Sequence, residues 1–348
     1  MISQLINMTE RGWMPDRLVR TGIRQLLRKR LAKVDLGDAA ANELRFKELV
    51  AEFSQGPIAL VPEKANEQHY EVPAELFELT LGPRRKYSSC FFADDTTDLA
   101  EAEEESLRQT CQRAELVDGM KVLELGCGWG SLSLWMAEHY PNSELTVVSN
   151  SNSQREFIEA KSRELGIDKN LKVVTRDIND FEPDSRFDRT VSVEMFEHVR
   201  NHKLLMNRIS SWLVPDGKLF VHIFCHRKFT YRFQEEQKDD WMSRHFFSGG
   251  IMPGDGLLPS YQDDLTLEKK WCWNGQHYQQ TCEAWLANMD RNRSQIMPIL
   301  EQTYGKEDSV RWFNRWRMFY LACSELFGFS SGNEWWVSHY LFNNVVSR

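Results

Sequence analysis

The fold of this chain is decided by the stretch Met120-Lys-Val-Leu-Glu-Leu125-Gly126-Cys-Gly128-Trp-Gly130. Its first half has the composition of a buried strand, and three glycines at alternate positions follow directly. Glycines at such a turn let the backbone approach a ligand closely, and open α/β sheets bind ligands at the carboxyl ends of their strands. A dinucleotide fingerprint would place its third glycine at position 131, which is Ser131. The acid Glu124 stands where most such strands are apolar, so we expect it to hold the turn or attract a cation.

Strands and helices alternate after this turn. The pattern predicts strands over 144–148, 171–174, 187–193 and 217–222, and helices over 131–140, 152–165 and 201–213. Such alternation predicts an α/β fold with a parallel sheet and right-handed crossovers. The Gly- and Pro-rich residues 226–262 interrupt the rhythm and predict an inserted lid. Strands over 265–273 and 335–342, separated by helices, complete the pattern, and helices over 14–55 and 94–116 precede it.

Composition narrows the class of protein. The chain has 348 residues and a net charge of −8, which argues against a general nucleic-acid binder. No apolar run approaches the ~20 residues of a membrane span, and we expect no secretion signal. The seven cysteines include no Cys-x-x-Cys pair, which favours free thiols in the cytoplasm. Basic charge gathers between Arg11 and Lys33, where eight basic residues accompany the single acid Asp16.

The glycine turn resembles motif I of Rossmann-like S-adenosylmethionine-dependent methyltransferases. Further segments resemble the cyclopropane fatty acid synthase family: Tyr87-Ser88-Ser89-Cys90-Phe91, Glu194-Met-Phe-Glu-His198, and His277-Tyr278 ahead of Trp285. Within that family the chain is most similar to the coclaurine N-methyltransferase branch, through Phe246-Phe-Ser-Gly-Gly250-Ile-Met-Pro253, Gln262-Asp-Asp264 and Glu325-Leu-Phe-Gly-Phe329. The similarity runs from about residue 10 to the end.

The resemblance implies a class I methyltransferase fold with a seven-stranded, mostly parallel sheet. Residues 1–115 would form a helical cap that covers the cofactor, and residues 116–348 the Rossmann-like domain with its lid. The implied cofactor is S-adenosylmethionine. The residues implied to hold it are Tyr87, Ser88, Glu124, Gly126, Gly128, Asn150, Gln154, Asp177, Ile178 and Glu194.

The reaction implied by this branch is methyl transfer to the nitrogen of a small or medium amine, such as a tetrahydroisoquinoline. Glu197 and His198 are the implied amine-handling pair, with Glu194 beside them. A protonated amine has no lone pair with which to attack, so a carboxylate must bind the ammonium and accept its proton, directly or through the imidazole. Candidate substrate contacts are Tyr70, Glu71, His222, Phe246, Tyr278, Trp335 and Trp336.

Alternatives stay open at this point. Cyclopropane synthases carry a bicarbonate site, whose ligands would fall on position 89, Glu197, His222 and Tyr278, but position 89 is Ser instead of Cys. Synthases usually have Gly where this chain has Glu194, and the extra acid suits a cationic substrate better than a lipid alkene. A lipid acyl chain is the alternative acceptor, and Arg11–Lys33 would then meet anionic head groups; a solvated helix face is the plainer interpretation.

Other functional classes and partners can be weighed from the same residues. A non-catalytic cofactor-binding protein is the alternative from a different class, and a homodimer is left open. No metal site is predicted, because His222 and Cys225 would point to opposite faces of one strand. A nucleic-acid base methyltransferase would usually show an Asn/Asp-Pro-Pro-aromatic motif after the fourth strand, where Glu194-Met-Phe-Glu197 stands.

Overall fold

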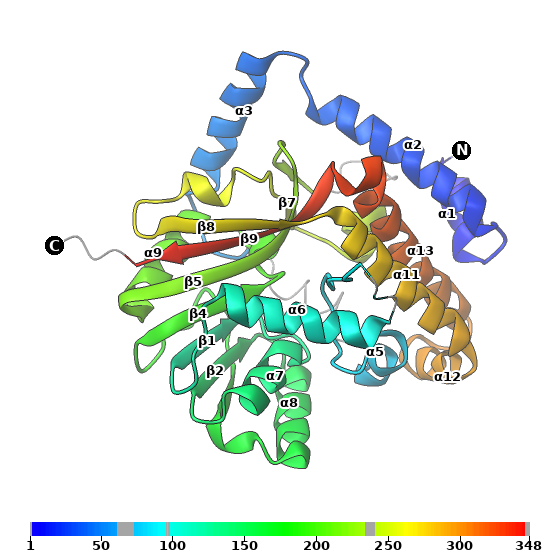
Figure 1. Ribbon diagram of the computed structural model, residues 1–348. Helices are drawn as coiled ribbons and strands as arrows, with labels where there is room; N and C mark the ends of the chain where they lie inside the picture. Colours follow the sequence, from blue (N-terminus) through cyan, green and yellow to red (C-terminus); the bar gives the residue numbers. More distant parts are fainter. Residues whose placement is uncertain (1, 61–72, 95, 97, 234–240, 345–348) are drawn as a thin grey trace.

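A seven-stranded sheet forms the centre of the molecule (Figure 1). The computed structural model describes residues 2–60, 73–94, 96, 98–233 and 241–344. The strand order is β3-β2-β1-β4-β5-β9-β8. The strands are β1 (Lys121–Leu125), β2 (Glu144–Ser149), β3 (Leu171–Thr175), β4 (Phe187–Val193), β5 (Leu213–His226), β8 (Thr266–Trp273) and β9 (Trp335–Asn343).

Pairing in the sheet follows the predicted α/β pattern. The strands β1 to β5 pair in parallel, whereas β9 lies antiparallel between β5 and β8. The predicted seven-stranded, mostly parallel sheet is therefore confirmed. The strand β5 extends beyond the predicted residues 217–222 at both ends, because its first residue Leu213 pairs with Phe187 of β4 and β9 pairs with it as far as His226. That long pairing brings the last strand of the chain beside the site described below.

Helices cover the sheet and build a second layer beside it. Those joined to the parallel strands are α6 (Leu99–Arg113), α7 (Ser131–His139), α8 (Asn152–Leu165) and α9 (His202–Trp212). The C-terminal group comprises α11 (Gly275–Arg291), α12 (Arg293–Tyr304) and α13 (Ser309–Phe327), against which α5 (Ala74–Thr80) packs. The predicted lid contains β6 (Tyr231–Arg232), α10 (Trp241–His245) and β7 (Ile251–Met252), and β6 pairs with β7.

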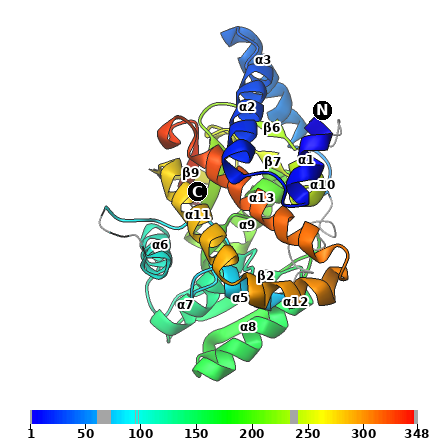
Figure 2. The same cartoon turned by 90° about the vertical axis from the view of Figure 1, so that its right-hand side faces the viewer.

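The N-terminal helices α1 (Ile2–Glu10), α2 (Asp16–Val34) and α3 (Ala39–Glu52) arch over the molecule, and α2 lies across α13 (Figure 2). Ion pairs fix that crossing. Arg20 contacts Glu283 at 2.6 Å and Glu325 at 3.1 Å, and Arg24 also pairs with Glu325. Two basic residues of the 11–33 segment therefore bind α11 and α13 instead of forming a uniformly solvated face. The division of the chain at residue 115 stays a prediction.

Local backbone geometry explains the glycine turn. Gly126, Gly128 and Gly130 all adopt positive φ, at 79°, 52° and 77°. A Cβ on Gly126 would stand 2.7 Å from the Met195 side chain, and one on Gly130 would stand 2.6 Å from Cγ1 of Ile158. Only glycine fits these two positions, because a side chain would be strained and would also collide.

Substitution of Gly130 by Ala separates these two effects. Gly166 is a matched control, because it has a similar φ of 70° but no described atom within 4 Å of its Cβ position. Gly166→Ala should cost about 1 kcal/mol of unfolding free energy, from backbone strain alone. Gly130→Ala should cost roughly 2–4 kcal/mol, because overpacking adds to the strain. Urea denaturation measures both, and equal losses would contradict the packing argument.

Candidate active site

Two cavities meet at the carboxyl ends of the parallel strands. The larger has a volume of about 540 Å³ and lies between the sheet, α2, α13 and the lid. The smaller has a volume of about 100 Å³ and lies over the glycine turn. His198 lines both of them. One imidazole therefore stands where a ligand in one cavity would meet a ligand in the other.

The smaller cavity collects most of the predicted cofactor residues. Its lining includes Gly126, Gly128, Asn150, Gln154, Asp177 and Ile178. Sequence reasoning missed Ser149, Arg176, Met195, Ser248 and Gly249, which also line it. The last two belong to the Phe246–Pro253 segment of the lid, so the resemblance there was a signal that could have found them.

One polar atom in this cavity points to a ligand. The side chain of Gln154 is 1% exposed, and its Oε1 accepts a hydrogen bond from Ser149 Oγ at 2.6 Å. Its Nε2 has no partner within the described part of the chain. A buried donor left unsatisfied costs about 1–3 kcal/mol. No described atom lies within 4 Å of a Cβ built on Gly128. An unpaired amide beside an open glycine turn fits a nucleoside ligand with polar groups, such as S-adenosylmethionine.

Four other predicted cofactor residues lie away from the smaller cavity: Tyr87, Ser88, Glu124 and Glu194. Glu124 is 2% exposed and accepts a hydrogen bond from Ser133 of α7, so its carboxylate ties the turn to the next helix. Burial raises the pKa of Glu124 to about 7, although the bond from Ser133 acts in the opposite direction. Ser88 accepts a bond from Lys86 Nζ at 2.6 Å, whereas Tyr87 lines the larger cavity.

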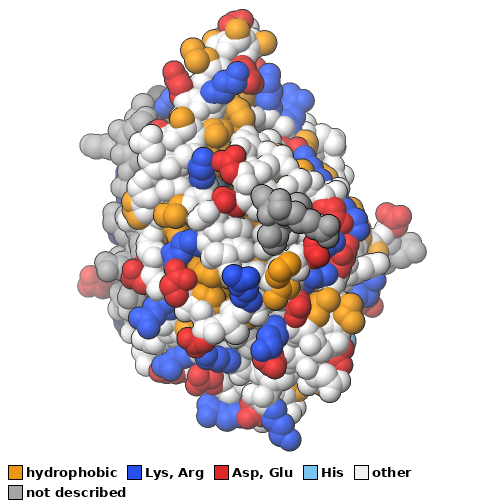
Figure 3. Space-filling view, turned by 90° about the vertical axis from the view of Figure 1, so that its left-hand side faces the viewer, with side chains coloured by type: hydrophobic (Ala, Val, Ile, Leu, Met, Phe, Trp, Pro, Cys, Tyr) orange, Lys and Arg blue, Asp and Glu red, His pale blue; other side chains and the backbone are white. Residues whose placement is uncertain are grey.

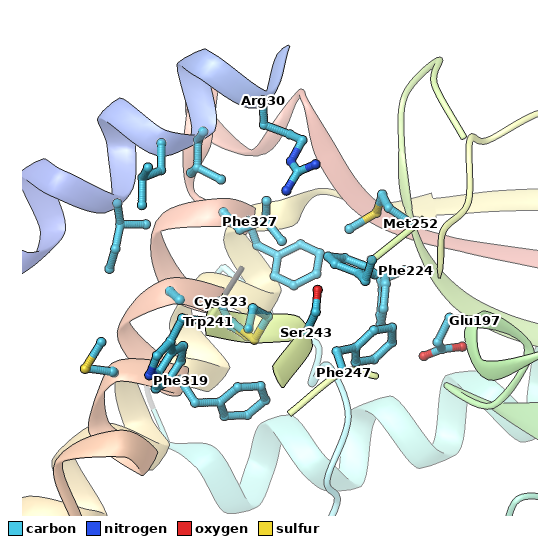
Figure 4. A pocket seen from close by; sticks show the side chains of 18 of the residues that line it. Arg30, Glu197, Phe224, Trp241, Ser243, Phe247, Met252, Phe319, Cys323 and Phe327 are labelled. Carbon is cyan, nitrogen blue, oxygen red and sulfur yellow. The ribbon is translucent and has the colours of Figure 1, made fainter. Parts of the chain in front are cut away.

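The larger cavity collects the predicted catalytic residues. Glu194, Glu197, His198 and Tyr278 all line it. Glu197 and His198 belong to a short 3-10 helix, Phe196–His198, that follows β4 directly. Figure 4 shows the Glu197 carboxylate at the edge of an otherwise mostly apolar cavity, beside Phe247. Glu197 is 1% exposed, and its Oε2 has no hydrogen-bond partner among the described residues.

Glu194 is the most strongly bonded acid of the site. Its backbone adopts a φ of 47°, in the left-handed region. Its Oε1 accepts the backbone N–H of Ser89 at 2.9 Å and lies 3.2 Å from Nε2 of His222. Its Oε2 accepts the hydroxyl of Tyr278 at 2.6 Å. Three of the four positions that the resemblance assigns to a bicarbonate site thus converge on a carboxylate of the chain itself.

Burial dominates the titration of both acids. It raises the pKa of Glu194, whereas the ammonium of Lys86, the Tyr278 hydroxyl and the Ser89 amide oppose that rise. Burial also raises the pKa of Glu197 well above its usual range, and the neighbouring Glu194 raises it further. The rise is marked for Glu197, and a carboxyl group whose pKa is raised in this way accepts a proton readily.

Several predicted substrate contacts lie elsewhere. Phe246 is fully buried and stacks on Phe319 at 4.6 Å, and Trp335 is fully buried with its indole N–H donated to Tyr231. Trp336 is half-buried and donates to Ser338. These predictions need correction, because the three rings do not line the larger cavity. His222 lies behind Glu194 and reaches the cavity only through it. Tyr70 and Glu71 lie outside the described residues.

Other aromatic and apolar side chains form the cavity wall instead. Figure 4 shows Phe224, Phe247, Phe319, Phe327, Trp241 and Met252 around it. The sequence signal for Phe247 was the Phe246-Phe247 pair, in which the second ring faces the cavity. Three basic residues of α2 also line it: Lys29, Arg30 and Lys33.

Comparison with known proteins gives the family. The family model for mycolic acid cyclopropane synthetase matches residues 61–334. The (S)-coclaurine N-methyltransferase of Thalictrum flavum subsp. glaucum is 37% identical over 98% of this chain and 95% of that protein. The cyclopropane-fatty-acyl-phospholipid synthase of Escherichia coli (strain K12) is 30% identical over 63% of this chain and 54% of that protein.

A solved structure agrees with these sequence matches. The crystal structure of coclaurine N-methyltransferase bound to N-methylheliamine and SAH is 34% identical, with a TM-score of 0.91 over 98% of both chains. The fold and the two cavities define an S-adenosylmethionine-dependent methyltransferase, and N-methylation is the favoured reaction. The chain belongs to the mycolic acid cyclopropane synthetase family.

In the described ranges, no three His, Cys, Asp or Glu side chains gather in a group that could hold a metal ion. No helix among the described residues is both long and apolar enough to cross a bilayer. On the face shown in Figure 3, acidic and basic side chains are intermingled. The seven cysteines, all of them described, are unpaired.

Replacement of Glu124 by Gln tests the buried carboxyl group of the glycine turn. The pKa of Glu124 is about 7 in the folded protein, against 4.5 for an ordinary Glu. The folded protein therefore holds a proton that the unfolded chain releases, and stability falls as pH rises from about 4.5 to 7. Between pH 5 and pH 8, the unfolding free energy of the Glu124→Gln variant should rise relative to that of the unmodified protein, by at most about 3 kcal/mol. A difference that does not change with pH would contradict this account.

Proposed function

We propose that this enzyme methylates the nitrogen of a small or medium amine, of tetrahydroisoquinoline type or another alkyl amine. The observation that carries the proposal is the buried Oε2 of Glu197 at the larger cavity, which has no partner in the part of the chain that the structure describes. An ammonium N–H is the donor that such an oxygen lacks. The coclaurine and pavine N-methyltransferases of Thalictrum flavum subsp. glaucum, 37% and 31% identical to this chain, support an amine acceptor.

The smaller cavity would hold the cofactor. Gln154 Nε2 would donate to its nucleoside, and Gly126 and Gly128 would let its methionine part approach the backbone. The bound cofactor supplies an electrophilic methyl group on its sulfonium. Since His198 lines both cavities, an amine held there stands next to the cofactor cavity. Alignment of the reactants in this way contributes most of the rate, because no covalent intermediate is needed.

Glu197 and His198 would handle the proton of the amine. The raised pKa of Glu197 suits it to take a proton from an ammonium, directly or through the imidazole of His198. Glu194 would remain the anion that attracts the cationic substrate, since Ser89 and Tyr278 donate to its carboxylate. The aromatic wall would add cation–π attraction of roughly 0.5–2 kcal/mol for each well-placed ring.

A lipid acyl chain is the second candidate acceptor. The observation that favours it is the row of Lys29, Arg30 and Lys33 along the cavity, which would suit an anionic head group. Against it stands Glu194, whose carboxylate takes the Ser89, His222 and Tyr278 contacts that a bicarbonate would need. We therefore rank it second. Location in the cytoplasm, membrane contact through Arg11–Lys33 and a homodimer stay predictions.

Release of S-adenosylhomocysteine tests the proposal directly. The purified chain is offered a panel of secondary and tertiary amines and, separately, vesicles of unsaturated phospholipid. Turnover with amines supports the proposal. Turnover with vesicles alone would replace it by the lipid reaction. Turnover with neither, despite cofactor binding, would favour the non-catalytic alternative.

Glu197→Gln keeps the size of the side chain but removes its basicity. We expect kcat on the best amine to fall at least ~100-fold, because general base catalysis contributes roughly 10²–10⁴-fold. Affinity for S-adenosylhomocysteine, measured by calorimetry, should change less than about twofold, since Glu197 does not line the smaller cavity. That affinity also controls for correct folding. A variant with near-normal kcat would exclude Glu197 as the base.

A further inference from the structure

Four polar side chains form a continuous line from the end of α6 to the site. Nη1 of Arg113 lies 2.6 Å from Nδ1 of His339. Nε2 of His339 lies 2.9 Å from Nδ1 of His222, and Nε2 of His222 lies 3.2 Å from Oε1 of Glu194. Arg113 and His339 are not among the residues of either cavity.

The sheet builds this line. His222 on β5 faces His339 on β9 directly in the antiparallel register, and both side chains are fully buried. Trp273 of β8 packs against both rings, with centroids 5.2 Å and 4.4 Å away. Arg113, the last residue of α6, lies over Trp271 and Trp273 at 5.5 Å and 5.6 Å. Water is therefore kept from both imidazoles.

The guanidinium of Arg113 fixes the donor and the acceptor of every hydrogen bond in this line. Arginine only donates, so Nδ1 of His339 must accept. A neutral His339 then carries its proton on Nε2 and donates to Nδ1 of His222. His222 in turn carries its proton on Nε2 and donates to Glu194. Burial lowers the pKa of both histidines well below the usual range, so both rings are neutral. Any other placement of the protons would set two N–H groups, or two lone pairs, against each other.

We propose that Arg113 and His339 are positioning residues that hold His222 as its Nε2–H tautomer and thereby keep Glu194 a carboxylate. This inference rests on the proposed function and deepens it. With Ser89 and Tyr278, His222 completes three donors on Glu194, so a protonated Glu194 would oppose one of them or force the buried Tyr278 hydroxyl to give up its acceptor. Of the two acids Glu194 and Glu197, only Glu197 then gains and loses a proton. The charge on Glu194 raises the pKa of Glu197.

Apart from Glu197, which opposes a second negative charge when it is ionised, the other titratable groups around Glu194 favour its carboxylate or stay neutral. They are Lys86, Cys90, His222, Tyr278 and Cys282. Lys86 adds a positive charge that favours the carboxylate, and it is held by Ser88 Oγ and the Ser89 carbonyl. Burial raises the pKa of Cys90 to about 12 and that of Cys282 also rises, so both thiols are uncharged.

Nitrogen-15 NMR of the histidine rings in the unmodified protein is the first test. Both His222 and His339 should be neutral and protonated on Nε2 between pH 6 and 8. Assignment uses single His→Gln variants. A proton on Nδ1 of either ring, or a charged His222, would overturn the proposal whatever the enzyme methylates. Failure of all amines in the turnover assay would instead overturn the proposed function.

Kinetics of paired variants are the second test. Gln at position 339 keeps an acceptor for Arg113 and a donor for His222, whereas Leu keeps neither, so His339→Leu should lose about 10–100-fold in kcat and His339→Gln should retain most of it. The acidic limb of the kcat/KM profile should move to lower pH in His339→Leu, because a protonated Glu194 no longer raises the pKa of Glu197. Arg113→Leu should behave like His339→Leu.

A matched control lies on the same helix. Arg108 of α6 bonds only Glu105 and Gln112 in the described structure, so Arg108→Leu should leave kcat and the pH profile unchanged. Affinity for S-adenosylhomocysteine checks the folding of every variant. Equal kcat and pH profiles in His339→Leu and His339→Gln would overturn the proposal.

Discussion

The site depends on a carboxylate that is buried and must be satisfied. Glu194 follows β4, and its oxygens contact the Ser89 backbone before α6, His222 on β5 and Tyr278 on α11. A buried charge without such partners would cost several kcal/mol, so these segments can pack only if they meet at Glu194. Its neighbour Glu197 has an oxygen at the cavity with no partner within the described ranges. One acid is thus fully bonded and the other is open to a ligand.

The sheet and the helices that cover it form the two cavities around these acids. The glycine turn provides a small cavity at the carboxyl ends of the strands, as in other open α/β sheets. The C-terminal helices, the lid and α2 enclose a larger, mostly aromatic cavity beside it. Two of the basic residues between Arg11 and Lys33, Arg20 and Arg24, form ion pairs that hold α2 on α11 and α13. The same helix lines the larger cavity, so α2 shapes that cavity as well as packing on α13.

Sequence reasoning predicted the glycine turn and the alternation of strands and helices, because both depend on residues close together in the chain. It also named, as cofactor residues, six of the residues that line the smaller cavity. It also singled out Glu194 as an acid where related synthases have Gly. It misplaced Phe246, Trp335 and Trp336, since side chains next to one another point to different sides and only packing decides which ring meets the cavity. It gave no signal for Arg113 or His339, which reach Glu194 only through strand register and the end of α6.

The sequence alone determined the class of protein: a strand, a glycine turn and alternating periodicity are short-range patterns, and local backbone preferences carry them. The tertiary structure decided which polar atoms are paired. Whether a carboxylate is bonded or open, and which nitrogen of a histidine holds its proton, depends on partners many residues away. Glu194 contacts groups on segments around positions 89, 222 and 278, and burial fixes the strength of each contact. That pairing gives Glu194 three hydrogen-bond donors and leaves Oε2 of Glu197 without a partner among the described residues.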